Sequence, residues 1–499
     1  MARKPVKSKK PASKISKASP VKAKPAGKNA REQLLAAYSD TSEAVEHALF
    51  RTQDAEDVSG FWPSSLVLGM CYGKICSGLY VAAGPEQASK SSALAEILGQ
   101  SLKANTVHIK HYDVERAMRS SYMGGIISYY SGIPWESLRG VKTAKGVAVH
   151  PRYRWLLEAQ LEKVFTEIRR YLTALPDKIY VTETKTWRLV FDVGTKEFPV
   201  SKQHTELHAR VAALYSLDNK MSDSKSKYYD VGDDPAFQVF YAIDSVKALT
   251  LRAIEDESKG FHQPGLMAKA LSDHLPYVKD LLRSKHAVIF AINQMYTNPM
   301  AKFSDPVYET AGNALKLHSD SRCIMKPKAV EDMFVRSKGK SGVCEEPSVI
   351  GAGKDEYTFK SIKNIKNKFA PPYLIGSLRV WSSGPKRIPG IDPVYDTVAF
   401  LEMIGLAKLG MGKPDGLKVS TLCVKMADSP LLEGYSKDVI PWLTFKAEIL
   451  AECGMDTGAE PSELRVICRD ILESGKAYEL AVSKDSAGVN HLADDSDEE

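Results

Sequence analysis

Residues 78–92 read Gly78-Leu79-Tyr80-Val81-Ala82-Ala83-Gly84-Pro85-Glu86-Gln87-Ala88-Ser89-Lys90-Ser91-Ser92. The apolar half, up to residue 84, predicts a buried strand, and residues 91–102 have the spacing of a helix. A glycine-containing loop between a strand and a helix is typical of a phosphate-binding loop. Its backbone N–H groups and the helix N-terminus surround the phosphates. All nine residues from 84 to 92 are therefore candidates for nucleotide contact, with Lys90 supplying positive charge and the Ser91 hydroxyl binding Mg²⁺.

Ser89 departs from the usual pattern, in which glycine precedes the lysine. Glycine is usual there because the backbone closes tightly on the phosphates. We expect serine to fit at some cost in ATP affinity or turnover. The motif alone leaves a chance glycine-proline loop as an equal alternative.

Three more apolar stretches predict strands, at residues 106–109, 237–243 and 287–292. Residues 266–282 predict a crossover helix that is kinked at Pro276. Strands that alternate with helices indicate an α/β fold with a parallel sheet.

Polar residues follow two of these predicted strands. Asp244 ends one strand, and Asn293 and Gln294 end the other. Ligands of open α/β sheets bind at the carboxyl ends of the strands. We therefore expect Asp244 to reach Mg²⁺ through water; the alternative is a structural helix cap.

The composition is ordinary for a folded protein, with 43% hydrophobic and 26% charged residues in 499. That length allows one large core plus appended domains. No apolar run reaches the roughly 18 residues of a membrane span, and the N-terminus does not resemble a secretory signal. The seven cysteines are scattered without a C-x-x-C pair, which favours a reducing compartment over a disulfide framework or a zinc site.

Both ends of the chain are strongly charged. Eleven Lys and Arg precede the first acid, Glu32, although the whole chain has a net charge of only +7. This tail, rich in Lys, Pro, Ala and Ser, is expected to be disordered. It is expected either to bind polyanions such as DNA or to be only a solubilising or targeting tail. Residues 494–499 form an acidic end.

These patterns predict five parts: a disordered basic tail (1–31), an N-terminal segment (32–66), an α/β core (67–370) with an insertion at about 124–235, a C-terminal domain (371–476) and an acidic tail (477–499).

Four blocks, in chain order, resemble the RecA family of homologous recombinases. The loop at 84–90 is similar to the family's Gly-Pro-Glu-Ser-Ser-Gly-Lys, and residues 244–250, Asp-Ser-Val-Lys-Ala-Leu-Thr, resemble its Asp-Ser-Val-Ala-Ala-Leu-Thr. Residues 293–316, which end in Gly-Asn-Ala-Leu-Lys, resemble the second DNA-binding loop, and 366–368 resemble a Lys-Asn-Lys element. The resemblance covers about 60–95, 106–123, 237–325 and 357–410.

This resemblance implies that residues 67–370 form a RecA-like P-loop NTPase core, an ATPase with a parallel-rich central sheet and a large insertion, followed by a small C-terminal α/β domain. It also implies that the N-terminal segment (32–66) docks on the neighbouring subunit. The divergent core and the size of the insertion suggest a phage member similar to the UvsX recombinases. The expected location is then the cytoplasm of a bacterial host cell.

The resemblance also assigns catalytic roles, one residue at a time. Glu115 would polarise the attacking water, although a surface acid on a loop is the alternative. Tyr122 would stack on adenine, and Arg119 replaces an acid that contacts the base in relatives. Gln294 would sense the γ-phosphate. Two lysines would reach the γ-phosphate of the neighbouring subunit, as an arginine finger does in trans; they are Lys366 and Lys368.

Two predicted loops would contact DNA. Backbone N–H donors and lysine charges would follow the phosphates without reading bases, and an aromatic ring could lie between bases. The candidate residues are Lys269, Lys302, Phe303, Thr310, Gly312, Asn313 and Lys316.

The sequence thus predicts a DNA-dependent ATPase that uses ATP and Mg²⁺ and forms a helical filament on single-stranded DNA for pairing with a homologous duplex. A single-strand-binding or loader protein is a candidate partner, and a membrane is not. Two alternatives stay open: a hexameric helicase with the same core, and a DNA-coating filament protein that has lost hydrolysis.

Overall fold

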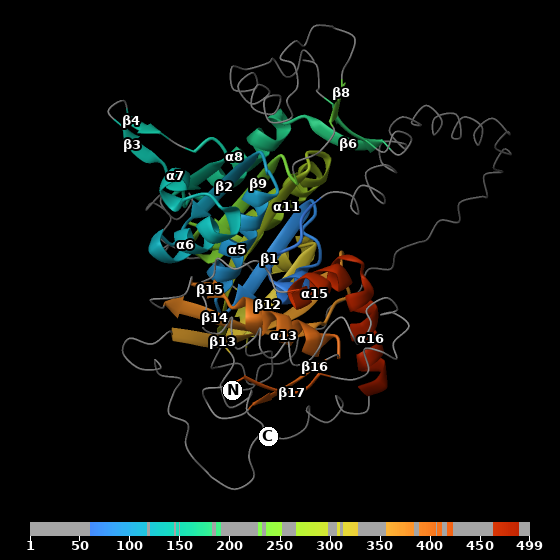
Figure 1. The fold of residues 1–499 in the computed structure, drawn as a ribbon. Coiled ribbons are helices and arrows are strands. Elements are labelled where there is room, and N and C mark those ends of the chain that lie inside the picture. The colour runs from blue at the N-terminus through green and yellow to red at the C-terminus, as the bar shows by residue number, and fades with distance from the viewer. Residues whose placement is uncertain are drawn as a thin grey trace, which may run out of the picture. The chain divides into compact units, whose positions relative to one another are not determined.

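The central sheet of this protein has helices on both faces (Figure 1). The computed structural model describes residues 60–116, 120–143, 146–148, 150–181, 186–190, 228–231, 236–251, 266–297, 307–309, 313–327, 356–383, 389–405, 407–411, 417–422 and 463–488. The basic tail, most of the docking segment and the acidic end lie outside these residues. The mixed α/β class with a mostly parallel sheet confirms the predicted fold class.

Six neighbouring strands of the sheet are parallel, in the spatial order β12-β1-β10-β9-β2-β5. In chain order they are β1 (Gly78–Gly84), β2 (His108–Asp113), β5 (Tyr153–Leu156), β9 (Val239–Asp244), β10 (Ala287–Thr297) and β12 (Ser321–Pro327). Antiparallel strands continue the sheet beyond β12 or flank β10: β13 (Glu356–Asn367), β14 (Ile375–Ser383), β15 (Gly390–Ile391) and β11 (Val307–Glu309). The parallel strands alone bring several loops to one edge of the sheet.

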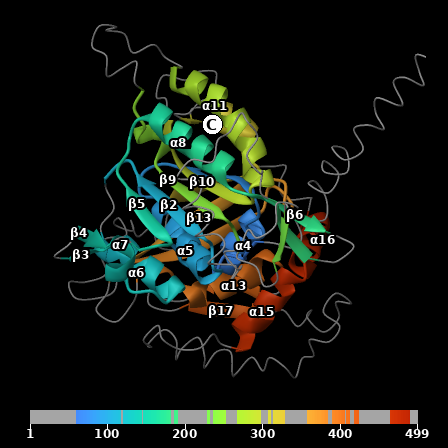
Figure 2. The same ribbon diagram turned by 90° about the horizontal axis from the view of Figure 1, so that it is seen from above.

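Two hydrophobic cores cover the two faces of the sheet. Neighbouring residues of β1 alternate between them, with Tyr80 in one core and Val81 in the other. This alternation follows from the two-residue period of a strand. The first core holds α4 (Leu66–Tyr72), α5 (Lys90–Lys103) and α6 (Ser120–Ser131); the second holds α8 (Leu161–Ala174) and α11 (Leu266–Ser284) (Figure 2).

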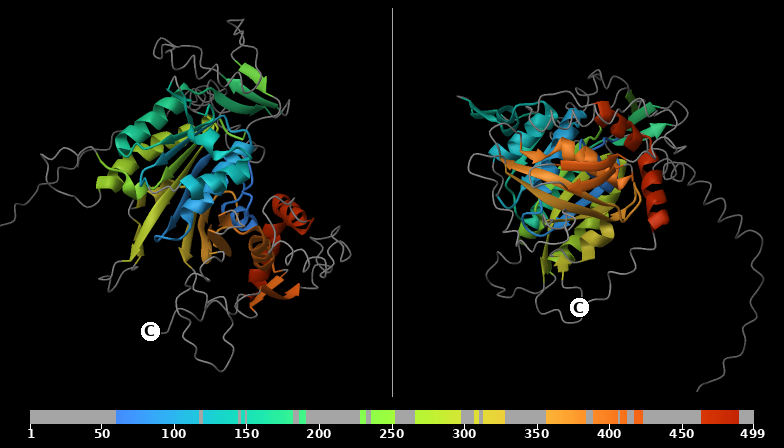
Figure 3. Two further views of the ribbon diagram at one scale, coloured as in Figure 1. Left: turned by 60° about the vertical axis from the view of Figure 1, so that its left-hand side comes forward. Right: turned by 60° about the horizontal axis from the view of Figure 1, so that its bottom comes forward.

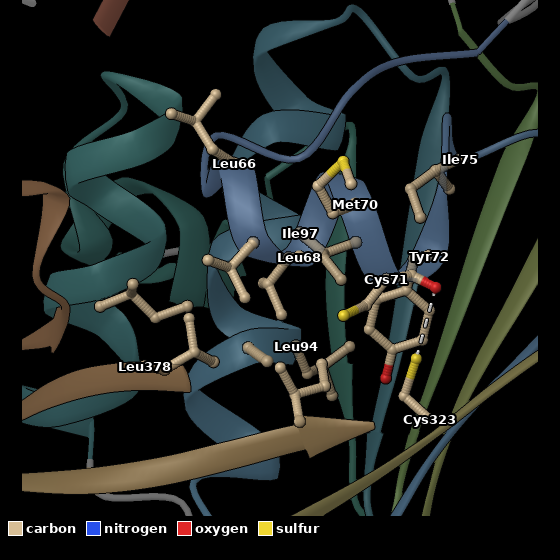
Figure 4. Packing of buried hydrophobic residues seen from close by; sticks show 14 of the residues in the cluster. Leu66, Leu68, Met70, Cys71, Tyr72, Ile75, Leu94, Ile97, Cys323 and Leu378 are labelled. Carbon is tan, nitrogen blue, oxygen red and sulfur yellow. Dashed lines mark hydrogen bonds between the residues drawn. The ribbon is translucent and has the colours of Figure 1, made fainter. Parts of the chain in front are cut away.

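The first core is built around α4, whose seven residues are all buried. Leu68 of α4 lies beside Leu94 and Ile97 of α5 (Figure 4). The Cys323 thiol donates to the Cys71 carbonyl at 3.6 Å, and the four described cysteines are buried. Helix α5, which follows the loop after β1, is therefore packed against a buried apolar layer.

Helices from the C-terminal part of the chain pack on α4; they are α13 (Pro393–Met403) and α15 (Glu463–Glu473) (Figure 3). Asp396 of α13 caps the N-terminus of α4, because its carboxylate accepts hydrogen bonds from Ser65 Oγ at 2.5 Å and from the Leu66 N–H at 2.7 Å. Arg465 of α15 pairs with Asp396 at 3.1 Å. The domain limits stay predictions, and the sheet continues across the expected boundary at residue 370 from β13 to β14.

Within the predicted insertion, β5 joins the main sheet while β6, β7 and β8 form a separate three-stranded sheet. No described helix combines the length and apolar character needed to cross a membrane. The remaining elements are α7 (Trp135–Arg139), β3 (Val141–Thr143), β4 (Gly146–Ala148), β6 (Asp177–Val181), β7 (Thr186–Val190), β8 (Tyr228–Val231), η1 (Val246–Ala248), α12 (Asn313–His318), β16 (Ala407–Met411), β17 (Leu417–Leu422) and α16 (Lys476–Gly488).

Glu96 of α5 is a buried acid in this first core. Its Oε1 accepts a hydrogen bond from the Ser65 N–H at 2.5 Å, whereas Oε2 has no hydrogen-bond partner among the described residues. Burial raises the pKa of Glu96 to about 8; the Ser65 N–H opposes this, Asp396 adds to it, and Arg465 and Arg469 oppose it. Between the ordinary pKa of a glutamate and about 8, Glu96 is therefore protonated in the folded chain and ionised in the unfolded chain.

We expect stability to fall as pH rises from about 5 to about 8, because the folded-state pKa of Glu96 lies above its ordinary value. Glu96→Gln should keep the hydrogen bond from Ser65 and flatten this dependence. Urea unfolding at several pH values measures the pH dependence of stability, with Glu136→Gln, at an exposed position of α7, as the control. An unchanged pH slope in Glu96→Gln would contradict the assignment.

Candidate nucleotide-binding site

The loop between β1 and α5 has a backbone that accepts few side chains. A Cβ on Gly84 would lie 2.1 Å from the carbonyl oxygen of Met325, so this position requires glycine. Gln87 and Ser89 both have φ of 59°, in the left-handed region. The position where the sequence departs from the usual motif is thus one where glycine relieves real strain.

Lys90 begins α5 and its side chain crosses the mouth of the loop. The ammonium donates to the carbonyl oxygens of Gly84 at 3.0 Å and of Pro85 at 2.5 Å. Burial lowers the pKa of Lys90, and the nearby carboxylates of Asp244, Glu115 and Glu86 raise it. The Lys90 ammonium is therefore held beside the loop, where it could contact an anion bound by the loop.

Ser91 and Asp244 supply neighbouring oxygens for a cation. The Ser91 hydroxyl donates to Asp244 Oδ2 at 2.8 Å. Burial raises the pKa of Asp244 to about 7; the Ser91 hydrogen bond opposes this, and Glu115 and Asp113 add to it. A hydroxyl and a carboxylate are hard oxygen ligands that suit Mg²⁺, and a dication would relieve the crowding of acids. The residues present fit a magnesium site.

Glu115, two residues after β2, and Gln294, within β10, are brought together by the sheet. Gln294 Nε2 donates to Glu115 Oε1 at 2.8 Å, and the Ser245 hydroxyl donates to the same oxygen. On the other side of the amide, Lys247 Nζ donates to Gln294 Oε1 at 2.8 Å. The predicted base and the predicted phosphate sensor thus form one hydrogen-bonded unit, which gives a carboxylate that can accept a proton and an amide that can respond to a phosphate.

Tyr122 lies against the end of the loop, on α6. Its hydroxyl is 2.7 Å from Ser92 Oγ and donates to the Trp381 carbonyl at 3.4 Å. Burial raises the pKa of Tyr122, so the hydroxyl stays protonated. Stacking on adenine stays a prediction, and Arg119 lies outside the described residues.

The two lysines expected to act in trans make their described hydrogen bonds away from the loop. Lys366 Nζ donates to the carbonyl oxygens of Lys316 and Leu317, at 2.8 Å each, near the end of α12. Lys368 Nζ pairs with Asp320 at 2.9 Å. Within this chain the structure therefore groups both lysines with α12, and a role in trans stays a prediction.

Three of the predicted DNA-binding residues are described. Lys269 is exposed on α11, Asn313 is exposed on α12, and Lys316 is half-buried on α12. The two helices are in contact, and Lys279 of α11 donates to the carbonyl of His318 at 3.0 Å. The DNA contacts stay predictions; outside the described residues lie Lys302, Phe303, Thr310 and Gly312.

Sequence analysis did not single out Lys247 or Asp320. Lys247 was visible in the segment 244–250, where this chain has lysine and the RecA segment has alanine. Asp320, which is buried and pairs with Lys279 and Lys368, had no local motif around it. A motif comparison finds the first kind of residue, whereas only the folded chain shows the second.

Comparisons with known proteins found relatives that match part of the chain. No family model matches the chain. The protein RecA of Borrelia duttonii (strain Ly) is 33% identical over 141 residues, which is 28% of this chain and 34% of that protein. RecA of Teredinibacter turnerae is 30% identical over 183 residues, covering 35% and 48%. RecA of Borreliella burgdorferi (strain ZS7) is 28% identical over 195 residues, covering 38% and 49%.

The chain thus spans between a third and a half of the length of these relatives. A crystal structure of the RadB recombinase is 12% identical and covers 63% of this chain and 92% of that one, at a TM-score of 0.30, which is too loose to support an argument. The RecA matches support a RecA-like recombinase family for the chain.

We expect Ser89→Gly to stabilise the chain by about 0.5–1 kcal/mol and to tighten ATP binding. A left-handed residue other than glycine costs about 1–2 kcal/mol, and the greater freedom of glycine in the unfolded chain cancels about 0.4–1 kcal/mol of the gain. The Ser89 side chain makes no capping hydrogen bond that would be lost. Urea unfolding and ATP titration measure the two effects.

Ser272→Gly, at an exposed position of α11, is the matched control. It places glycine in an ordinary helix and should destabilise the chain by about 0.5 kcal/mol. If both variants were destabilised alike, strain at Ser89 would not be relieved by glycine, and the argument would be wrong.

Proposed function

We propose that this chain is an ATP-dependent DNA recombinase of the RecA type. It binds ATP with Mg²⁺, forms a helical filament on single-stranded DNA, and pairs that strand with a homologous duplex in recombination and repair. We place this activity in the cytoplasm, in a bacterial host cell if the gene belongs to a phage. A single-strand-binding or loader protein is the expected accessory partner.

The observation that carries the proposal is the meeting of Lys90, Ser91, Asp244, Glu115 and Gln294 at one edge of the sheet. Lys90 and Ser91 lie on α5, whereas the others come from three neighbouring strands: Asp244 ends β9, Glu115 lies two residues after β2, and Gln294 is within β10. A cation, a metal-binding pair, an acceptor for a proton and an amide are the parts needed for attack of water on a terminal phosphate.

In this proposal each residue has one task. Backbone N–H groups of the loop and Lys90 bind the phosphates, and Mg²⁺ held by Ser91 and Asp244 neutralises their charge. Glu115 orients the attacking water and accepts its proton. Gln294 donates to Glu115 and lies in β10, the strand that leads to the second predicted DNA loop. A change at the γ-phosphate that moves Gln294 would therefore shift β10 and the loop after it.

The second candidate function is a filament protein that coats DNA without hydrolysing ATP. The left-handed Ser89 favours it, because strain beside Lys90 can misplace the ammonium. A hexameric helicase stays the third candidate; rings instead of open filaments in electron micrographs would support it.

We expect wild-type protein to hydrolyse ATP faster with single-stranded DNA than without it, and Lys90→Ala to lose at least about 100-fold of that rate. Lys103→Ala, at the exposed end of the same helix, is the control and should behave as wild type. Steady-state phosphate release measures the rates. Absence of hydrolysis in every protein, with DNA binding intact, would reject the ATPase and leave the coating protein.

The role of Lys366 in trans has a separate test. Glu115→Gln should lack its own base, and Lys366→Ala should lack the cation that it offers to a neighbour, so each alone should be nearly inactive. Mixed in equal amounts, they should recover about a quarter of the wild-type rate, because a head-to-tail interface completes one site in four. No recovery on mixing would argue that Lys366 acts within its own subunit.

A further inference from the structure

Lys247 occupies a turn that leaves its side chain beside the candidate site. It is the middle residue of η1, directly after β9 and Asp244. Val246 and Leu249 on either side are buried in the second core, whereas the Lys247 side chain is 36% exposed. Packing of Val246 and Leu249 therefore fixes the backbone at residue 247, while the Lys247 side chain stays partly exposed.

The Lys247 ammonium connects two parts of the site. It donates to Gln294 Oε1 at 2.8 Å and lies 4.0 Å from Oε1 of Glu86 in the phosphate-binding loop. Gln294 in turn donates to Glu115 at 2.8 Å. The Ser245 hydroxyl, two residues before Lys247, donates to the same Glu115 oxygen. Residues 245 and 247 thus hold the base and the sensor together.

The chemistry of an amide makes this arrangement specific. An ammonium can only donate and an ionised carboxylate can only accept. With Lys247 on Oε1 and Glu115 on Nε2, the Gln294 amide has one orientation that satisfies both partners. The ammonium also polarises the amide, which strengthens the N–H donated to Glu115, because hydrogen bonds in a chain reinforce one another.

We propose that Lys247 is a positioning residue for ATP hydrolysis: it fixes the orientation of Gln294 and, through that amide, the placement of Glu115. This inference rests on the proposed function. It adds to the chain a cation that acts within the subunit, at a point where the RecA segment has alanine. Its effect is on the rate of the chemical step, since the lysine acts through Gln294 and not on the nucleotide.

The test is steady-state ATP hydrolysis with single-stranded DNA by Lys247→Met, which keeps the length of the side chain and removes the charge. We expect kcat to fall about tenfold, within the range by which a displaced proton acceptor slows a reaction, with KM changed less than about twofold. Lys247→Arg, which still donates to Gln294 Oε1, should restore most of the rate.

Lys163→Met is the matched control. Lys163 is also on the surface, 64% exposed, and lies 3.9 Å from Glu158, much as Lys247 lies 4.0 Å from Glu86. It has no described contact with the site, so its loss should leave kcat and KM as in wild type. The control separates a specific effect from the removal of any surface ion pair.

A double-mutant cycle tests whether Lys247 acts through Gln294. If it does, adding Lys247→Met to Gln294→Ala should change kcat less than about twofold beyond Gln294→Ala alone. Full additivity of the two losses, a rise in KM with kcat unchanged, or no effect of Lys247→Met would each overturn the inference.

The proposed function and this inference fail in different ways. A wild-type chain without hydrolysis overturns the proposed function and this inference with it. An active wild type whose rate is unaffected by Lys247→Met overturns this inference alone.

Discussion

Backbone hydrogen bonds between parallel strands determine which side chains meet at the candidate site. In the register of the sheet, Gly84 at the end of β1 lies opposite Gln294 of β10, and Asp113 at the end of β2 lies opposite Asp244 of β9. A slip of one residue in any of these pairings would turn the side chains to the other face of the sheet. The two cores prevent such a slip, because each strand buries alternate residues on both faces. The geometry of the candidate site is thus a consequence of core packing.

Burial of a carboxylate at this edge of the sheet disfavours its charged form, and neighbouring donors offset part of that effect. Asp244 is surrounded by Glu115 and Asp113, and its pKa is raised to about 7. The Ser91 hydroxyl and the Lys90 ammonium offset part of that cost. Ser89 adds backbone strain directly before Lys90. Strain and partly compensated acids of this kind are tolerated where a ligand with the opposite charge supplies a further interaction.

The sequence was sufficient for features that depend on neighbouring residues. Apolar runs at 78–84, 237–243 and 287–292 correspond to β1, β9 and the first part of β10, and the loop pattern identified Lys90. It was not sufficient where partners are far apart in the chain. The cap of α4 joins Ser65 to Asp396, 331 positions away, and no local pattern indicates that pair. The continuation of the sheet into β14 depends on such pairings in the same way.

Asp320 joins α11, which carries one of the predicted DNA-binding residues, to Lys368 and to β1. Its buried carboxylate accepts from Lys279 of α11 at 3.1 Å and from Lys368 at 2.9 Å, and also from the Leu79 N–H in β1. Lys366 is bound to carbonyls near the end of α12. Freeing Lys366 from α12 therefore breaks two charge-assisted hydrogen bonds, one of which is exposed to solvent. In the proposed trans role, the anion of the neighbouring subunit would have to replace them, which would couple that step to the position of α12.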